Sequence, residues 1–237
     1  MTQPLGQIQK PSQSFYINKR KLLLVPNFLL PGNSDEQKKV LGKYWQDLIE
    51  PIQNLEKSLE KISHIYHELL YLDQENGLTA ISNINPHGHS LIETLIREGA
   101  QLEITEHKEL LAESTDWQRC LSIGLVSQSV ITQATESFQK TTKLRYEAIA
   151  SNIDKTLQKN ETGILFISEG HAIQFPSDIE VFYLTPPSVE DVKNFIQEEI
   201  RQMQERMNEN ISSSRATSSE ENDVEKEEEE DEQQELE

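Results

Sequence analysis

The fold is decided by one stretch, Gly163–His171, which reads GILFISEGH. Its apolar part, Ile164–Ile167, is rich in β-branched and aromatic residues and ends at a polar turn, which is typical of a strand buried on both faces. Apolar residues just upstream recur at helical spacing, so a helix leads directly into this strand, as in a βαβ unit. Those residues are Tyr146, Ile149, Ile153 and Leu157. We therefore predict an α/β fold with a small, mostly parallel sheet.

Two further apolar runs are typical of strands. Leu22–Val25 is continuous and stops at Pro26, and Ile179–Leu184 combines β-branched and aromatic residues. Three basic residues precede the first run, but it is short and is broken by Pro26, so we favour a buried strand over a signal segment. A weaker strand is expected at Ala100–Ile104.

Long packed helices are expected to make the domain helix-rich. Apolar residues between Trp45 and Leu69 are spaced alternately by three and four positions, which predicts a heptad helix that is bent or divided at Pro51. This seam comprises Trp45, Leu48, Ile52, Leu55, Leu59, Ile62, Tyr66 and Leu69. A second helical stretch is expected from Leu110 to Phe138. The seam predicts a coiled-coil surface for a protein partner or a homodimer.

Local signals mark where several helices begin and end. Ser34 or Asp35 can cap the helix that follows the Pro31–Asn33 turn. A short helix is expected from Ser90, with Gly99 just beyond its end, and a last helix is expected after Ser188.

The chain of 237 residues is expected to hold one ordered domain, residues 15–208. Residues 1–14 are rich in Gln, Pro and Ser, which predicts a flexible N-terminal arm. Residues 209–237 carry 13 acidic residues against two basic ones, so this segment supplies −11 of the net charge of −19. This segment contains few apolar residues, which predicts that it is a disordered acidic tail. Such a tail either solvates the domain or docks a basic protein partner.

Composition also excludes some classes of partner. The acidic balance repels nucleic-acid phosphates and anionic membranes, so neither is expected to bind. The single cysteine, Cys120, cannot form an internal disulfide, which favours a reducing compartment and hence the cytoplasm. Arg119 could activate this thiol as a nucleophile, but a buried, inert cysteine on an apolar helix face is the preferred interpretation.

The candidate site lies in the turn after the predicted strand Ile164–Ile167. Glu169 and His171 follow Ile167 directly, and ligands of open α/β sheets bind outside the carboxyl ends of the strands. A carboxylate and an imidazole there can supply a general base or the ligands of a divalent metal. A purely structural role for the same turn remains open.

Other histidines offer weaker signals. His87 and His89 lie in one predicted loop and could join His171 as metal ligands, although a plain turn is preferred. His64 and His67 are three positions apart on the predicted heptad helix, where they flank the apolar seam. They are interpreted as boundary residues.

Residues Arg145–Ile153 (RYEAIASNI) and Ile164–His171 (ILFISEGH) together resemble the downstream signature of the TraB/Tiki and erythromycin-esterase superfamily. That resemblance implies a metal-dependent peptidase or esterase, with Arg145 and His171 as site residues. The family's upstream Gly-x-x-His element has no counterpart after Leu22–Val25. A wider set of segments resembles an uncharacterised family of bacterial cytoplasmic proteins, which implies no known activity.

Two functions follow as hypotheses. The first is a non-catalytic interaction or regulatory module that uses the heptad helix and the acidic tail, and it needs no cofactor. The alternative is a divergent metal-dependent hydrolase whose site includes His171, Glu169 and Arg145, with His87 or His89. Convergence of these side chains in one concave pocket would favour the second.

Overall fold

The computed structural model describes residues 19–30 and 34–208, which fall into two compact units, Met1–Ser188 and Val189–Glu237. Described residues of the second unit, 189–208, are helical, as predicted, but Ser188 is itself helical and its buried Oγ makes no hydrogen bond to any described residue, so the predicted cap at Ser188 is wrong. The predictions of an N-terminal arm at 1–14, a turn at 31–33 and an acidic tail at 209–237 lie outside the described residues.

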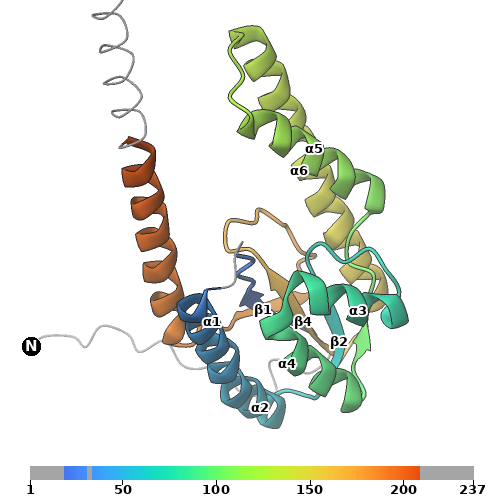
Figure 1. Cartoon of the computed structure of the whole chain (residues 1–237). Coiled ribbons are helices and arrows are strands. Elements are labelled where there is room, and N and C mark those ends of the chain that lie inside the picture. Colours follow the sequence, from blue (N-terminus) through green and yellow to red (C-terminus); the bar gives the residue numbers. More distant parts are fainter. Residues whose placement is uncertain (1–18, 31–33, 209–237) are drawn as a thin grey trace, which may run out of the picture. The chain divides into compact units, whose positions relative to one another are not determined.

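The first unit contains a five-stranded, all-parallel sheet with the order β3-β2-β4-β1-β5. Its strands are β1 (Arg20–Pro26), β2 (Ile62–His67), β3 (Gln101–Leu102), β4 (Thr162–Ile167) and β5 (Ile179–Tyr183). Its helices are α1 (Asp35–Asp47), α2 (Ile49–Ser58), α3 (Gln74–Ile84), α4 (Pro86–Arg97), α5 (Lys108–Ser122) and α6 (Gln128–Thr156). The prediction of a helix-rich α/β fold with a small parallel sheet is confirmed (Figure 1).

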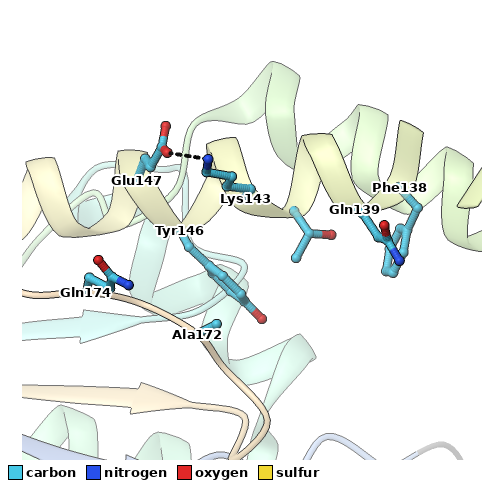
Figure 2. Close-up of a pocket in the computed structure, with 8 residues that line it drawn as sticks. Phe138, Gln139, Lys143, Tyr146, Glu147, Ala172 and Gln174 are labelled. Carbon is cyan, nitrogen blue, oxygen red and sulfur yellow. Dashed lines mark ion pairs between the residues drawn. The ribbon is translucent and has the colours of Figure 1, made fainter. Parts of the chain in front are cut away.

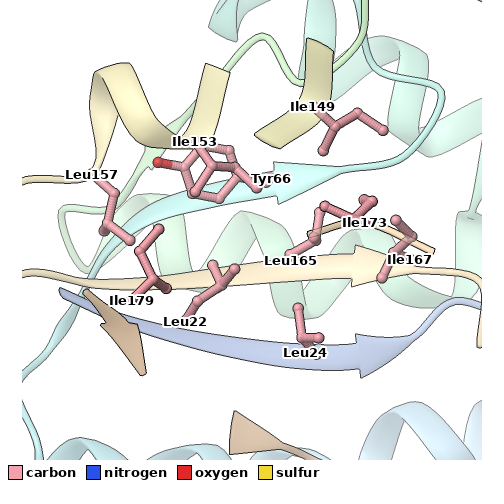
Figure 3. Packing of buried hydrophobic residues seen from close by; sticks show 10 residues of the cluster. All are labelled: Leu22, Leu24, Tyr66, Ile149, Ile153, Leu157, Leu165, Ile167, Ile173 and Ile179. Carbon is pink, nitrogen blue, oxygen red and sulfur yellow. The ribbon is translucent and has the colours of Figure 1, made fainter. Parts of the chain in front are cut away.

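Helices cover the sheet on both faces, which is why every residue of β1 and β4 is buried. On one face, Leu22 and Leu165 pack against Ile153 of α6 (Figure 3). On the other face, the ring of Phe166 lies 5.5 Å from that of Trp45 in α1. Successive residues of a strand point to opposite faces of the sheet, so β1 and β4 each contribute side chains to the core on both faces.

The predicted heptad helix is wrong beyond Ser58. Residues Ile62–His67 form β2, which pairs with β3 on one side and β4 on the other. Pairing with two neighbours satisfies the backbone of ISHIYH as fully as a helix would, and its Ile and Tyr residues suit a pleated sheet. The apolar residues Trp45 in α1, Leu48 between the two helices and Ile52 in α2 are buried, as expected of the seam.

Helix boundaries differ from expectation at three other places. The helix predicted to begin at Ser90 is α4, which begins at Pro86 because proline suits the first helical position and Asn85 caps it. The division near Pro51 falls at Leu48, which separates α1 from α2, so Pro51 lies in the first turn of α2, where its missing N–H costs little. The expected stretch from Leu110 to Phe138 is two helices, α5 and α6, joined at Gly124, whose φ is +78°. The caps at Ser34 and Gly99 are confirmed.

Gly88 allows α4 to pack against α1. A Cβ at this position would lie 2.7 Å from the Asn85 side chain and 2.9 Å from the Trp45 ring. Gly88→Ala is therefore expected to lower the free energy of unfolding by roughly 1–3 kcal/mol through overpacking. Chemical denaturation measures this, with Gly42→Ala as the control because its Cβ meets nothing within 4 Å. A neutral Gly88→Ala would contradict the close packing.

Candidate functional site

A polar cluster lies at the carboxyl ends of three adjacent strands. Asn27 follows β1, Glu68 follows β2 and Ser168 follows β4, the strand between them. The chain leaves β1 toward α1 on one face of the sheet, whereas the segment after β4 packs Ile173 into the core on the α6 face. Connections that diverge in this way open a crevice where open α/β sheets bind ligands.

Glu68 is the centre of the cluster. Its Oε1 accepts hydrogen bonds from Asn27 Nδ2 at 2.9 Å and from Ser168 Oγ at 2.9 Å, and its Oε2 lies 2.7 Å from the same hydroxyl. Only 8 % of the residue is exposed, and burial raises the pKa of its carboxyl, while the bonds from Ser168 and Asn27 oppose that shift. Glu68 is therefore a stronger base than an exposed carboxylate.

A chain of amides fixes the orientation of this carboxyl group. Asn85 Nδ2 donates to Asn27 Oδ1 at 2.8 Å, and Asn27 in turn donates to Glu68. Asn85 also caps α4, because its Oδ1 accepts from the Gly88 N–H at 2.9 Å. The start of α4 is thus tied to the position of Glu68.

His67 lies beside Glu68 and is fully buried. Its Nδ1 lies 2.5 Å from the carbonyl oxygen of Glu68, and its Nε2 lies 3.4 Å from Asn27 Nδ2. These partners fit a neutral ring that donates from Nδ1 and accepts at Nε2. Burial lowers the pKa of His67 to about 4, so the ring adds no positive charge to the cluster at neutral pH.

Ser168 differs from these partners because it is exposed. Its hydroxyl therefore reaches solvent on one side and the buried Glu68 carboxylate on the other. A hydroxyl within hydrogen-bonding distance of a base with a raised pKa is the arrangement that activates a serine nucleophile.

Arg145, the site residue implied by the resemblance, pairs with Glu106. Arg145 Nη2 lies 2.5 Å from Glu106 Oε1, and the side chain of Glu106 is fully buried. Glu106 also accepts from the N–H of Leu69, whose φ is +67°. The pair belongs to the same electrostatic neighbourhood, since the charge of Glu106 contributes to the raised pKa of Glu68.

His171 and Glu169 line one small cavity, as the sequence suggested. It has a volume of about 130 Å³ and lies at the ends of β1, β4 and β5. Its other lining residues are Leu24, Val25, Pro26, Ile167, Tyr183 and Thr185. His171 is half-buried, which lowers its pKa, and its Nδ1 accepts from the Ile173 N–H at 3.3 Å. Ser168 is not among the lining residues, since its hydroxyl is directed at Glu68, but its chain neighbours Ile167 and Glu169 are.

The remaining histidines do not assemble a metal site. His87 and His89 lie in the first turn of α4 instead of a loop, and burial lowers the pKa of His87. His64 is held in β2 between two carboxylates, with Nδ1 2.8 Å from Glu103 and Nε2 3.0 Å from Glu161. Across residues 19–30 and 34–208, no group of three or more His, Cys, Asp and Glu side chains could hold a metal ion.

A larger cavity of about 550 Å³ lies between α6 and the segment after β4 (Figure 2). Tyr146 lies against its wall near Ala172, and Lys143 pairs with Glu147 at 3.9 Å. Burial raises the pKa of Tyr146, Arg145 opposes the shift, and the charges of Glu68 and Glu106 add to it. Tyr146 therefore lies within electrostatic range of Glu68 and Glu106.

Sequence reasoning identified Ser168 as part of the turn but missed Glu68, Asn27 and Asn85 as members of the site. The available signal was a polar residue directly after each buried strand. Glu68 was hidden because its strand was interpreted as the end of the heptad helix.

No protein-family model, curated protein or solved structure matches this chain. The resemblance to the TraB/Tiki and erythromycin-esterase superfamily therefore stays a prediction. Among the described helices, none is both long and apolar enough to cross a membrane.

Replacing Glu68 with glutamine tests its raised pKa. The folded state favours the protonated carboxyl, so the wild type loses stability as the pH rises through the folded pKa. Glu68→Gln removes that loss and can still bond to Asn27 and Ser168. The unfolding free energy of the wild type, relative to the variant, should fall as the pH rises from 4.5, the ordinary pKa of a glutamate, through the raised pKa of the folded state. Urea denaturation across this range measures it, and a constant difference would contradict burial of the charge.

His67 gives the opposite pH dependence. Because its pKa is lowered from 6.5 to about 4, the fold is stabilised above pH 6.5 and loses that contribution as the pH falls toward 4. The loss should be on the order of 3 kcal/mol. His67→Gln lacks the titrating ring, so its unfolding free energy should fall less than that of the wild type as the pH is lowered, in the same denaturation series. An equal loss of unfolding free energy in acid for both proteins would show that His67 does not remain neutral when folded.

Proposed function

We propose that this chain is a serine hydrolase of small esters, with Ser168 as nucleophile and Glu68 as its general base. The observation that carries the proposal is the exposed Ser168 hydroxyl at 2.7 Å from the buried, oriented carboxylate of Glu68. Glu68 has the raised basicity and the fixed orientation that a general base needs to abstract a proton. It also lies in the crevice of the parallel sheet, where ligands of such folds bind.

The reaction follows from these two side chains. Glu68 accepts the proton of the Ser168 hydroxyl while Oγ attacks the acyl carbon of the ester. The protonated Glu68 then returns the proton to the leaving alkoxide, and an acyl-serine remains. In the second half, Glu68 takes a proton from water, the resulting hydroxide attacks the acyl group, and Ser168 is released with its proton restored.

We place the acyl group of the substrate in the cavity lined by Ile167 and Glu169, the chain neighbours of Ser168. Its 130 Å³ equals roughly four water molecules at about 30 Å³ each, which fits a short acyl chain. Its wall is apolar at Leu24, Val25 and Ile167, and His171 is its polar edge. In this proposal His171 and Glu169 contact the substrate. Arg145 neutralises the charge of the nearby Glu106.

The proposal does not use the metal ligands that the sequence suggested. Those ligands, His171, His87 and His89, form no ligand group in the described parts of the chain. The chemistry proposed here runs through Ser168 and Glu68 and needs no metal.

A second candidate function is the interaction module predicted from the sequence, in the cytoplasm that the single cysteine favours. The observation in its favour is the exposed apolar surface at the end of α5 and α6, where Val126 is 96 % exposed. The heptad helix no longer contributes to it, since β2 interrupts the seam.

A fluorophosphonate probe tests the hydrolase proposal directly. Attack by Ser168 Oγ on phosphorus expels fluoride, the proton passes to Glu68, and the protein gains the mass of one phosphonyl group. We expect intact-mass spectrometry to detect one adduct, which peptide mapping locates at Ser168. Glu68→Gln should label at least about a hundredfold more slowly, the usual effect of losing a general base.

Controls separate this chemistry from general reactivity. Ser168→Ala should not label, whereas Ser90→Ala and Glu98→Gln, which alter exposed residues on α4 and at its end, should label like the wild type. Turnover of p-nitrophenyl acetate should exceed that of the octanoate ester, because the cavity is short. An unlabelled wild type, or equal labelling of Ser168→Ala, would refute the proposal.

A further inference from the structure

The larger cavity, between α6 and the segment after β4, takes no part in the chemistry at Ser168. Its volume is about 550 Å³, and small-molecule sites usually enclose roughly 300–1,000 Å³. None of the residues that line the smaller cavity beside His171 also lines this one. The larger cavity is therefore a second candidate binding site.

One face of α6 forms a wall of this cavity. Phe138, Thr142 and Tyr146 are spaced by four residues, so they lie in one row along the helix. The two aromatic residues are about 12 Å apart along the helix axis, at about 1.5 Å per residue. Figure 2 shows the Tyr146 ring extending from α6 toward Ala172, with Phe138 further along the same helix. The row thus offers an aromatic ring at each end and a hydroxyl between them.

The hydroxyl of Thr142 supplies the observation that points to a ligand. In the described helices, Thr94, Thr115, Thr132 and Thr156 each donate to the carbonyl oxygen four residues earlier. The hydroxyl oxygen of Thr142 is buried, yet it has no hydrogen-bond partner among residues 19–30 and 34–208. Leaving a buried hydroxyl unpaired costs free energy. Because this side chain lines the cavity, and a helical threonine has two favoured χ1 positions, a bound molecule can supply the missing partner.

The other polar groups decide what kind of molecule fits. Gln139 and Gln174 also line the cavity, and each amide presents a donor and an acceptor side by side. Lys143 lies 3.9 Å from Glu147, so these two exposed charges offset each other. An uncharged ligand therefore suits the cavity better than an anion or a cation. Planar heterocycles with neighbouring donor and acceptor groups match both the amides and the aromatic rings.

We propose that this cavity binds a nucleoside, with its base between Phe138 and Tyr146 and in hydrogen-bonding reach of Thr142 and the two glutamines. The volume equals roughly eighteen water molecules at about 30 Å³ each, which is more than one base occupies and leaves room for a sugar. A nucleotide is disfavoured, because its phosphate is repelled by a chain of net charge −19. The proposal is independent of the chemistry at Ser168.

Isothermal titration calorimetry of the full chain tests the proposal. The probes are adenosine, guanosine, cytidine and uridine, each titrated separately. At least one should bind with a Kd below about 1 mM. The 5′-monophosphate of that nucleoside should bind more weakly, because the phosphate adds negative charge. Binding of none of the four, or tighter binding of the monophosphate, would overturn the proposal.

Matched variants on α6 assign the binding to this cavity. Thr142→Val keeps the shape of the side chain but removes the hydroxyl, so it should weaken binding about three- to tenfold. Because the described residues leave that hydroxyl unpaired, the same variant should not lower the free energy of unfolding. Phe138→Ala should weaken binding about tenfold through lost contact with the base.

Thr132→Val is the control, because it removes a hydroxyl from the same helix that already bonds to the Gln128 carbonyl oxygen and does not line the cavity. Its affinity for the nucleoside should equal that of the wild type. Wild-type affinity in Thr142→Val, or an equal loss of affinity in Thr132→Val, would show that the nucleoside binds elsewhere.

Discussion

The insertion of β4 between β1 and β2 is the constraint on which the rest of the structure depends. Parallel pairing aligns Leu24 with Leu165 and Tyr66 with the same Leu165, so all three strands end at one edge of the sheet. Asn27, Glu68 and Ser168 thereby meet although about 140 residues separate the first from the last. No local interaction could have brought these side chains together.

The pairing also explains why a carboxylate can be buried there. Burying Glu68 costs free energy, and it is tolerated only because Asn27 and Ser168 direct hydrogen bonds at it. The neutral ring of His67 and the pairing of Glu106 with Arg145 keep further unpaired charge out of the region. Such a group is unfavourable for stability, which is the physical reason to relate it to chemistry.

Two surfaces of the molecule then have separate properties. The crevice at the sheet edge is polar and open to solvent at Ser168, whereas the connection between α5 and α6 carries no charged residue and exposes Ile123 and Val126. The same chain segment connects them, since α6 carries Val130 at its start and Arg145 nearer its end.

Most of the secondary structure was encoded locally and could be predicted. The strands at β1, β4 and β5, the cap at Ser34 and the turn at Gly99 follow from short-range patterns, because burial on both faces and positive φ each leave a signature in adjacent residues. β2 could not be recognised, since ISHIYH also fits helical spacing and only its two neighbours in the sheet favour the strand. The turn Ser168–His171 was recognised for the same local reason, and His171 and Glu169 do line one cavity.

The sequence by itself therefore determined which segments are buried and where polar turns follow them. Tertiary structure alone decided that β4 lies between β1 and β2, and hence that Glu68 rather than His171 is the partner of Ser168. The physical reason is that strand order depends on pairing between segments far apart in the chain. Spacing along the sequence carries no direct record of such pairing.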